Sequence, residues 1–358
     1  MEQLKRWGTF LLILAILGSG AVLLFQDTVS ECLSILRTRR GAASYVLAAT
    51  DTEGQIYVLG QDQEGYTLVL GDQTGQQTAL WHLSAEELPA QSVPAALYPA
   101  AGGAVYLGLY NTEEETCLQL YRLTQEGTAA ELLLSEPCQG ENLQAQMASL
   151  RLSSFSQVES VVTFALLEGD TATFYRRTGT GHGLEKAGTF TQPGLRTAMV
   201  LSDGTQLLAC EDSLVRTDGD TIPLTDGEVI IGLTQAGTGV YYVDSAGLNV
   251  FYADFANWQP YSILELEKEA YDLDDCTDLW VTREGDVLLL MGGDTLLLDR
   301  GSTVTDLTTL LYPTALRCTL ILAGLALAVL VLTLALWYAI CEQQRLRLPM
   351  LVRWGILT

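Results

Sequence analysis

Residues 45–83 read YVLAATDTEGQIYVLGQDQEGYTLVLGDQTGQQTALWHL, a series of short apolar runs separated by Asp, Gly, Thr and Gln. Apolar or alternating runs of four to eight residues bounded by turn-forming residues predict β-strands. The stretch therefore predicts a unit that contains an apolar strand, a turn, a strongly apolar strand, a second turn, and one or two further strands.

The same order of strands and turns recurs five more times along the chain. The further copies are residues 96–134, 148–190, 197–224, 229–264 and 278–307. Glycines precede the strongly apolar strand at equivalent places in five of the six units: Gly54, Gly103, Gly204, Gly239 and Gly285. Consecutive units begin roughly 30 to 50 residues apart, and a period near 40 with four strands per unit is typical of propeller blades.

These repeats resemble the WD40/YVTN/PQQ-type β-propellers over about 260 residues. The resemblance implies an all-β ring of about six blades. The family signatures are incomplete, because no blade ends in Trp-Asp and the tryptophans Trp81, Trp258 and Trp280 are not periodic. A β-sandwich or a pair of smaller β domains would show similar runs, but six copies in one order favour the propeller.

Two segments predict transmembrane helices that flank the propeller. Residues 8–25 and 318–341 carry no charge, and about 20 apolar helical residues cross a hydrocarbon core of about 30 Å. The first segment has an alternative reading as a cleaved signal peptide, since basic residues precede it. Cleavage at the small residues 19–21 would leave an apolar stretch on the mature end, so we favour a retained anchor.

The basic residues beside the two segments predict the orientation. Lys5 and Arg6 precede the first segment, and Arg345, Arg347 and Arg353 follow the second. Both ends of the chain are therefore expected in the cytoplasm, and the protein is expected in the inner (cytoplasmic) membrane. The predicted order is a cytoplasmic tail 1–7, helix 8–25, linker 26–43, extracytoplasmic propeller 44–315, helix 316–341 and basic stub 342–358.

The extracytoplasmic part is strongly acidic. Residues 27–315 contain 41 acidic and 13 basic residues, a net charge of −28. Such a field repels nucleic acid and anionic lipid headgroups, which excludes DNA or RNA as a partner. A solvated acidic surface is the simplest interpretation.

No catalytic or metal-binding motif is evident. The two histidines, His82 and His182, lack the context of a catalytic triad, and no zinc or phosphate-binding motif is present. We therefore predict a non-enzymatic protein without a cofactor. Calcium is the one metal to weigh, because hard oxygen ligands at short spacing suit it, although a solvated acidic loop is the simpler interpretation. Its candidate ligands are Asp272, Asp274, Asp275 and Asp278.

Five cysteines fall in residues 27–315: Cys32, Cys117, Cys138, Cys210 and Cys276. An exported domain permits disulfides, and an odd count leaves one thiol over. Cys117 and Cys138 are the candidate pair because they belong to one repeat. The alternative is that all five are small hydrophobic residues in the interior.

These features together predict a ligand-sensing or ligand-binding domain that signals through two adjacent helices. The arrangement resembles the input half of bacterial transmembrane receptors, which implies an output module or a cytoplasmic partner. The chain ends at Thr358 within an apolar pattern, which is consistent with a receptor interrupted before its output module. The expected partners are the lipid bilayer and an extracytoplasmic small molecule, glycan or protein. The alternatives are an envelope scaffold or adhesion protein and, third, a propeller-class enzyme.

Overall fold

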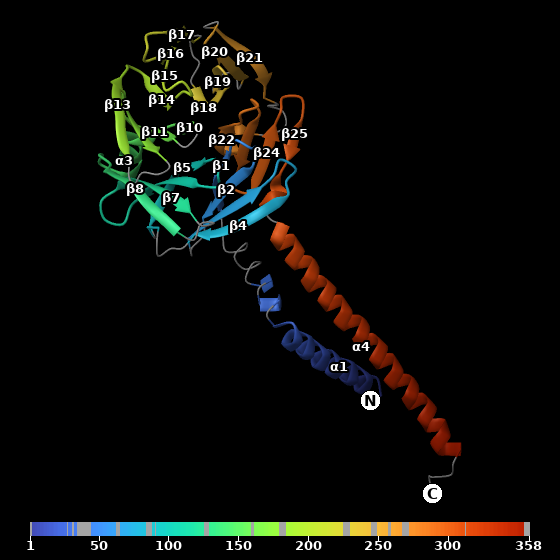
Figure 1. Ribbon diagram of the computed structural model, residues 1–358. Coiled ribbons are helices and arrows are strands. Elements are labelled where there is room, and N and C mark those ends of the chain that lie inside the picture. The colour runs from blue at the N-terminus through green and yellow to red at the C-terminus, as the bar shows by residue number, and fades with distance from the viewer. Residues whose placement is uncertain are drawn as a thin grey trace. The chain divides into compact units, whose positions relative to one another are not determined.

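The computed structural model divides the chain into two compact units, residues 43–311 and residues 1–42 with 312–358 (Figure 1). It describes the whole chain except residues 1, 27, 31, 34–43, 62–64, 84–87, 90, 125–128, 159–160, 179–183, 225–229, 245–248, 257–258, 267–271, 312 and 354–358.

The larger unit is a six-bladed β-propeller, which confirms the predicted fold. Each blade is an antiparallel sheet of strands that are consecutive in the chain. The first three blades are β1 (Ser44–Thr50), β2 (Ile56–Gln61), β3 (Tyr66–Gly71) and β4 (Gln77–Leu83); β5 (Ser92–Pro99), β6 (Val105–Asn111), β7 (Cys117–Thr124) and β8 (Ala129–Pro137); and β9 (Arg151–Leu152), β10 (Ser156–Val158), β11 (Val161–Glu168), β12 (Thr171–Thr178) and β13 (Glu185–Thr191).

The other three blades follow the same order. They are β14 (Leu195–Val200), β15 (Gln206–Cys210), β16 (Ser213–Arg216) and β17 (Thr221–Pro223); β18 (Ile230–Ala236), β19 (Gly239–Asp244), β20 (Asn249–Asp254) and β21 (Gln259–Glu265); and β22 (Cys276–Val281), β23 (Val287–Met291), β24 (Thr295–Asp299) and β25 (Val304–Asp306). Short helices α3 (Leu143–Ser149), η1 (Leu273–Asp275) and η2 (Thr308–Leu310) lie in the connections.

The burial of the strands explains their sequence pattern. The second strand of each blade packs against neighbouring blades on both faces, so all five residues of β23 are buried and all but the last of β2. Strands buried on both faces read as continuous apolar runs. The outermost strand β4 alternates between exposed and half-buried residues, because only one of its faces is covered.

The glycine pattern needs one correction. Gly54, Gly103, Gly204 and Gly285 lie in turns with φ between 80° and 87°, the left-handed region that favours glycine. Gly239 does not belong to this group, because it is the first residue of β19 and the turn glycine before it is Gly237, with φ of 56°. The prediction placed the turn of the fifth blade two residues too late.

The ring closes without exchange of a strand between the first and last blades within the described residues. The closing contacts join residues from the two ends of the propeller sequence, at least 227 positions apart. The backbone N–H of Ala48 donates to Asp278 Oδ2 at 2.7 Å, and Trp280 Nε1 donates to Thr50 Oγ1 at 3.1 Å. The Tyr45 hydroxyl donates to the carbonyl oxygen of Leu311 at 2.8 Å, so the two ends of the propeller lie together.

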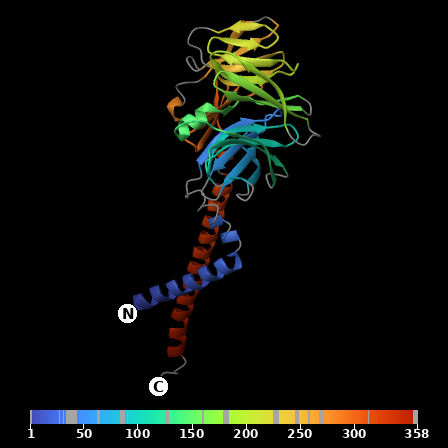
Figure 2. The ribbon, with the colours of Figure 1, turned by 90° about the vertical axis from the view of Figure 1, so that its left-hand side faces the viewer.

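The smaller unit contains helices α1 (Glu2–Leu24) and α4 (Pro313–Arg353). Phe10 and Trp337 form an edge-to-face contact with ring centroids 6.0 Å apart, and Figure 2 shows α1 crossing α4. Both helices extend beyond the predicted spans, because α1 begins at Glu2 and α4 continues to Arg353. The predicted tail and stub are therefore largely helical.

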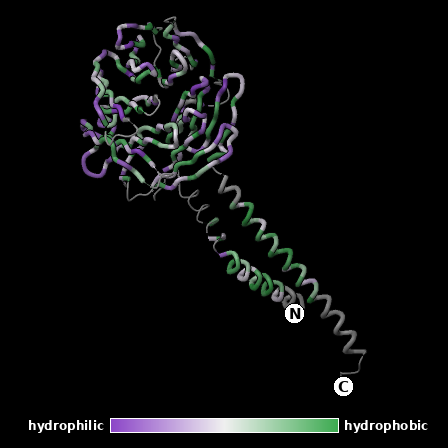
Figure 3. The backbone as a smooth tube through the Cα atoms, in the orientation of Figure 1, coloured by the Kyte–Doolittle hydropathy of each residue, from purple (hydrophilic) through white to green (hydrophobic). Residues whose placement is uncertain are grey.

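One helix in the described part of the chain is long and apolar enough to cross a membrane. It is Cys318–Ile340, whose 23 residues at about 1.5 Å each exceed the roughly 30 Å of a hydrocarbon core. The apolar part of α1, Gly8–Leu24, is shorter, and both segments are hydrophobic in Figure 3. The structure thus supports one candidate span and leaves the second as a prediction. Most of the predicted linker 26–43 lies outside the described residues.

Candidate functional site

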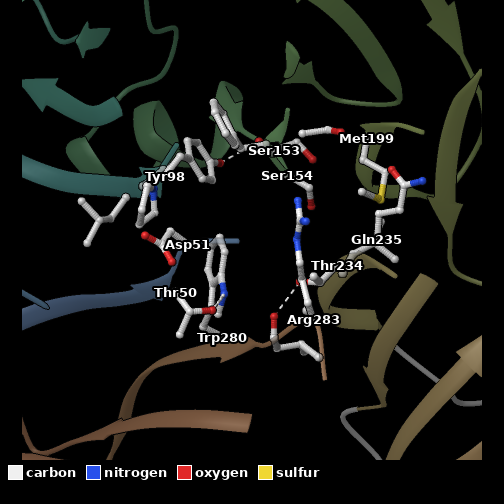
Figure 4. Close-up of a pocket in the computed structure, with 18 of the residues that line it drawn as sticks. Thr50, Asp51, Tyr98, Ser153, Ser154, Met199, Thr234, Gln235, Trp280 and Arg283 are labelled. Atoms are coloured by element: carbon white, nitrogen blue, oxygen red, sulfur yellow. Dashed lines mark hydrogen bonds between the residues drawn. The ribbon is translucent and has the colours of Figure 1, made fainter. Parts of the chain in front are cut away.

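A cavity of about 550 Å³ lies at the centre of the ring, where the innermost strands of all six blades meet (Figure 4). Its wall comes from β1, β5, β9, β10, β14, β18 and β22 and from the turns that follow some of them. Ligand pockets commonly have volumes of about 300–1,000 Å³ and combine aromatic walls with a few polar groups. The cavity has the size and position of a small-molecule site.

Aromatic residues form one side of the cavity. Tyr98 stacks on Phe155 with centroids 5.4 Å apart and rings inclined by 13°, and its centroid lies 6.4 Å from that of Trp280. The Tyr98 hydroxyl donates to the carbonyl oxygen of Ser153 at 2.6 Å. The bond to Thr50 fixes the Trp280 indole, so the rings are held in place by partners outside the stack.

Hydroxyl groups line another part of the wall, and most are already bonded within the protein. Ser153 Oγ accepts from the backbone N–H of Ala198 at 2.7 Å and lies 2.7 Å from Thr197 Oγ1. Thr234 Oγ1 donates to the carbonyl oxygen of Val281 at 2.7 Å. Gln235 Nε2 donates to Ser202 Oγ at 2.6 Å. These bonds join neighbouring blades and keep the wall rigid.

Asp278 is a half-buried carboxyl group of the cavity wall on β22. Burial raises the pKa of this group from 3.8 to about 6, and the backbone N–H groups of Ala48 and Leu279 partly offset the effect by hydrogen bonding to the carboxylate. Burial mainly, and the negative charge of Asp278 to a smaller extent, raise the pKa of Tyr98. A carboxyl with a pKa near 6 in a cavity can exchange a proton near neutral pH.

The two remaining charged residues of the cavity differ in their bonding. Asp51 Oδ1 accepts from the backbone N–H groups of Glu53 and Gln55 at 2.8 and 2.9 Å, so this carboxylate shapes a turn. Arg283 is exposed and forms no hydrogen bond or ion pair with the described residues. Figure 4 shows its side chain projecting into the cavity in the direction of Ser154.

The structure does not bring the four proposed calcium ligands together. Asp272, Asp274 and Asp275 are exposed around η1, where Asp272 Oδ1 accepts from the backbone N–H of Asp274 at 3.1 Å. Asp278 lies instead on β22 in the cavity wall. Within the described ranges no group of three or more potential metal ligands is gathered at one point.

Cys117 and Cys138 are half-buried and both carry free thiols. Cys117 lies opposite Pro137 in the β7–β8 pair, and Cys138 follows Pro137 directly. Burial, and to a smaller extent Cys117, raises the pKa of Cys138. The thiols are neighbours across a strand pair, and their oxidation to a disulfide stays a prediction.

The other singled-out residues lie away from the cavity or outside the described set. His82 is exposed near the end of β4, and His182 is not among the described residues. Lys5 and Arg6 belong to α1, and Arg345, Arg347 and Arg353 belong to α4. Their role in orienting the chain stays a prediction.

The sequence matches no protein-family model and no curated protein, whereas the fold is shared with many solved structures. A virginiamycin B lyase from Staphylococcus aureus is 10% identical, with a TM-score of 0.46 and coverage of 75% of this chain and 85% of the lyase. The periplasmic gluconolactonase of Pseudomonas aeruginosa is 14% identical, with a TM-score of 0.44 and coverage of 73% and 84%. The extracellular domain of a putative one-component system from B. thetaiotaomicron is 11% identical, with a TM-score of 0.37 and coverage of 72% and 38%.

These comparisons correct the prediction of a non-enzymatic protein. The lyase, the gluconolactonase and a putative 6-phosphogluconolactonase from Bacteroides fragilis show that enzymes share this fold with the chain. The prediction relied on local catalytic motifs, whereas a fold can bring together the residues of a site from distant parts of the sequence. At 10–15% identity the likeness shows the fold alone and assigns no reaction to this chain.

Sequence reasoning missed most of the cavity. It found no basic or aromatic constellation, yet Tyr98, Trp280 and Arg283 lie together in the wall. Tyr98 and Trp280 are next to last in the innermost strands β5 and β22, and Arg283 follows the end of β22 by two residues. Aligning the six repeats and marking the polar and aromatic residues near the ends of these strands would have found them.

Proposed function

We propose that this protein is a membrane-anchored extracytoplasmic propeller that binds a small ligand in its central cavity and passes the binding event to helices α1 and α4. The observation that carries the proposal is the cavity itself, to which all six blades contribute. A ligand there contacts several blades at once and therefore changes the free energy of contacts between blades. The apolar segment Cys318–Ile340 supports the membrane anchor.

Ligand binding is tested with the full chain in detergent and a collection of polar small molecules, by thermal shift and calorimetry. A ligand at 100 times its Kd is expected to stabilise the folded protein by about 2.7 kcal/mol. Ser154 lines the cavity, and its hydroxyl has one weak contact with the described residues, to Thr197 Oγ1 at 3.3 Å. Ser154→Trp is therefore expected to fill the site and abolish binding.

The matched control is Ala187→Trp, which adds an indole at an exposed position of β13 outside the cavity. It is expected to bind the ligand as the unaltered protein does. Equal binding by the Ser154→Trp and unaltered proteins would place the ligand elsewhere and refute the cavity as the site.

The pairing of the helices is tested with cysteines at Phe10 and Trp337, in a chain whose seven native cysteines are replaced by serine. In membranes, a short bismaleimide is expected to join the two positions, so that protease cleavage within the propeller leaves the halves linked. Leu11→Cys with Trp337→Cys is the control, because Leu11 is 58% exposed.

Addition of ligand is expected to change the rate of the Phe10–Trp337 cross-link if binding reaches the helices. An unchanged rate under saturating ligand would contradict the signalling part of the proposal and leave an anchored binding protein. Cross-linking of the Leu11 control as efficiently as the Phe10 pair would contradict the specific pairing.

Catalysis is the second candidate function, and Asp278 is the observation that favours it. A carboxyl whose pKa is about 6 and which lines a cavity can act as a proton acceptor or donor. Mass spectrometry of each bound compound after incubation distinguishes the two functions. A compound recovered unchanged supports binding, and a new mass that Asp278→Asn prevents supports catalysis.

A further inference from the structure

The cavity wall contains one cation that has no partner among the described residues, and two carboxyl groups that accept hydrogen bonds from the protein backbone. The charged residues that line the cavity are Asp51, Asp278 and Arg283. Asp51 Oδ1 accepts two hydrogen bonds from backbone N–H groups of the turn that follows it. Asp278 accepts hydrogen bonds from backbone N–H groups of β1 and β22. Neither carboxyl forms an ion pair with Arg283. The guanidinium therefore has donor capacity that the described residues do not use.

Most of the other arginines of the propeller do have a carboxylate partner, and Arg151 is the one exception among the described residues. Six of them form ion pairs with Asp or Glu: Arg122, Arg176, Arg177, Arg196, Arg216 and Arg300. In a chain with 43 acidic and 19 basic residues, carboxylates are the abundant partner. An arginine that projects into a cavity without such a partner is placed to take one from a ligand.

The uncharged part of the wall indicates the shape and polarity of the rest of the ligand. Aromatic rings at Tyr98, Phe155 and Trp280 offer apolar faces on one side of the cavity, and Gln235 offers polar atoms on the opposite side (Figure 4). Most other hydroxyls are already bonded within the wall. A compact body with both an apolar face and hydroxyl groups fits this surface, as a cyclic or sugar-sized skeleton does.

We propose that the ligand of the central cavity is a small hydroxylated carboxylate, whose carboxylate group accepts paired hydrogen bonds from the Arg283 guanidinium while its body lies against Trp280 and Tyr98. This proposal rests on the proposed function, since it requires the cavity to be a binding site. A guanidinium forms two parallel N–H bonds with a carboxylate, which fixes the orientation of the ligand as well as its position.

The experiment uses the full chain in detergent and measures Kd by calorimetry for compounds that share a skeleton and differ in charge. The carboxylates are galacturonate, glucuronate, shikimate and quinate, the neutral counterparts are galactose and glucose, and the amine is galactosamine. Galactose 1-phosphate provides the phosphate arm. At least one carboxylate is expected to bind about tenfold or more tightly than its neutral counterpart.

Arg283→Gln is expected to raise the Kd of that carboxylate about tenfold or more and to leave the Kd of the neutral compounds unchanged. Because Arg283 is exposed and bonds to no described residue, the variant is expected to melt with the unaltered protein. Arg283→Lys keeps the charge but loses the paired geometry, so an intermediate affinity is expected. Lys186→Gln is the matched control, since it removes one positive charge from an exposed site outside the cavity.

The outcomes separate this proposal from the proposed function. Neutral compounds that bind, are blocked by Ser154→Trp and are unaffected by Arg283→Gln would overturn the carboxylate and keep the cavity as a site. Exclusive binding of the phosphate compound would overturn the carboxylate as well. Equal weakening by Lys186→Gln would trace the effect to net charge and overturn the role of Arg283. Carboxylate binding that survives Ser154→Trp would refute the cavity for both proposals.

Discussion

Replacing Phe174 with alanine is expected to lower the free energy of unfolding by about 3–5 kcal/mol. Phe174 lies on β12 with none of its surface exposed, and its ring meets that of Phe190 edge to face with centroids 5.9 Å apart. It packs in a core cluster that joins the third and fourth blades, including Leu167 and Leu208. Truncation leaves a void in a region where flanking strands cannot collapse inward, because each is tied to its own sheet.

Denaturant unfolding of the full chain in detergent, followed by far-ultraviolet circular dichroism, measures this loss. Leu132→Ala is the control, because Leu132 lies on the outermost strand β8 and is 49% exposed. Its effect is expected to stay within about 0.5 kcal/mol. A loss below about 1 kcal/mol for Phe174→Ala would contradict the tight packing between these blades.

Replacing Asp278 with asparagine is expected to remove a pH-dependent destabilisation of the propeller. The pKa of this carboxyl is about 6 in the folded chain and about 3.8 when unfolded. Between these values the folded state binds the proton more strongly, so its contribution to stability falls as the pH rises from about 4 to 6. Two pKa units correspond to roughly 3 kcal/mol. Above pH 6 the full cost is present, because the folded state then holds an ionised carboxyl in the wall.

The measurement is the difference in unfolding free energy between the Asp278→Asn and unaltered proteins at pH 4.5, 6 and 8. Asparagine keeps an oxygen that can accept from the backbone N–H of Ala48. About a third of the full cost is already present at pH 4.5, because this pH lies above the unfolded pKa. The difference is therefore expected to move in favour of the variant by roughly 2 kcal/mol between pH 4.5 and 8. Asp274→Asn is the control, since that residue is exposed near η1. A difference that does not vary with pH would refute the raised pKa.

The blades could be predicted from sequence because strand burial leaves a local signal. The second strand of each blade is buried on both faces, and so stretches such as VLLLM in β23 stand out against their Gly and Asp turns. The fifth turn was misplaced because residues 237–239 contain two glycines, and only the backbone conformation distinguishes Gly237 from Gly239. Element boundaries depend on such details more than element type does.

The cavity could not be predicted in the same way, because its residues are adjacent only after the ring closes. Trp280 and Thr50 are 230 positions apart and share a hydrogen bond, while each in isolation looks like an ordinary strand residue. Asp278 was grouped with Asp272, Asp274 and Asp275 by proximity in sequence. The strand β22 carries it away from those residues and into the wall, where its partner is the backbone of β1.

Between the first and last blades, the propeller ring is closed by noncovalent bonds and not by the polypeptide chain. Every other pair of adjacent blades is joined by the chain itself, whereas β1 and β22 are held by noncovalent bonds alone. Two of those bonds, at Asp278 and Trp280, come from residues of the cavity wall. We expect a ligand that fills the cavity to strengthen or weaken these closing bonds. The chain leaves the propeller next to Tyr45 and Leu311, which are hydrogen-bonded to each other.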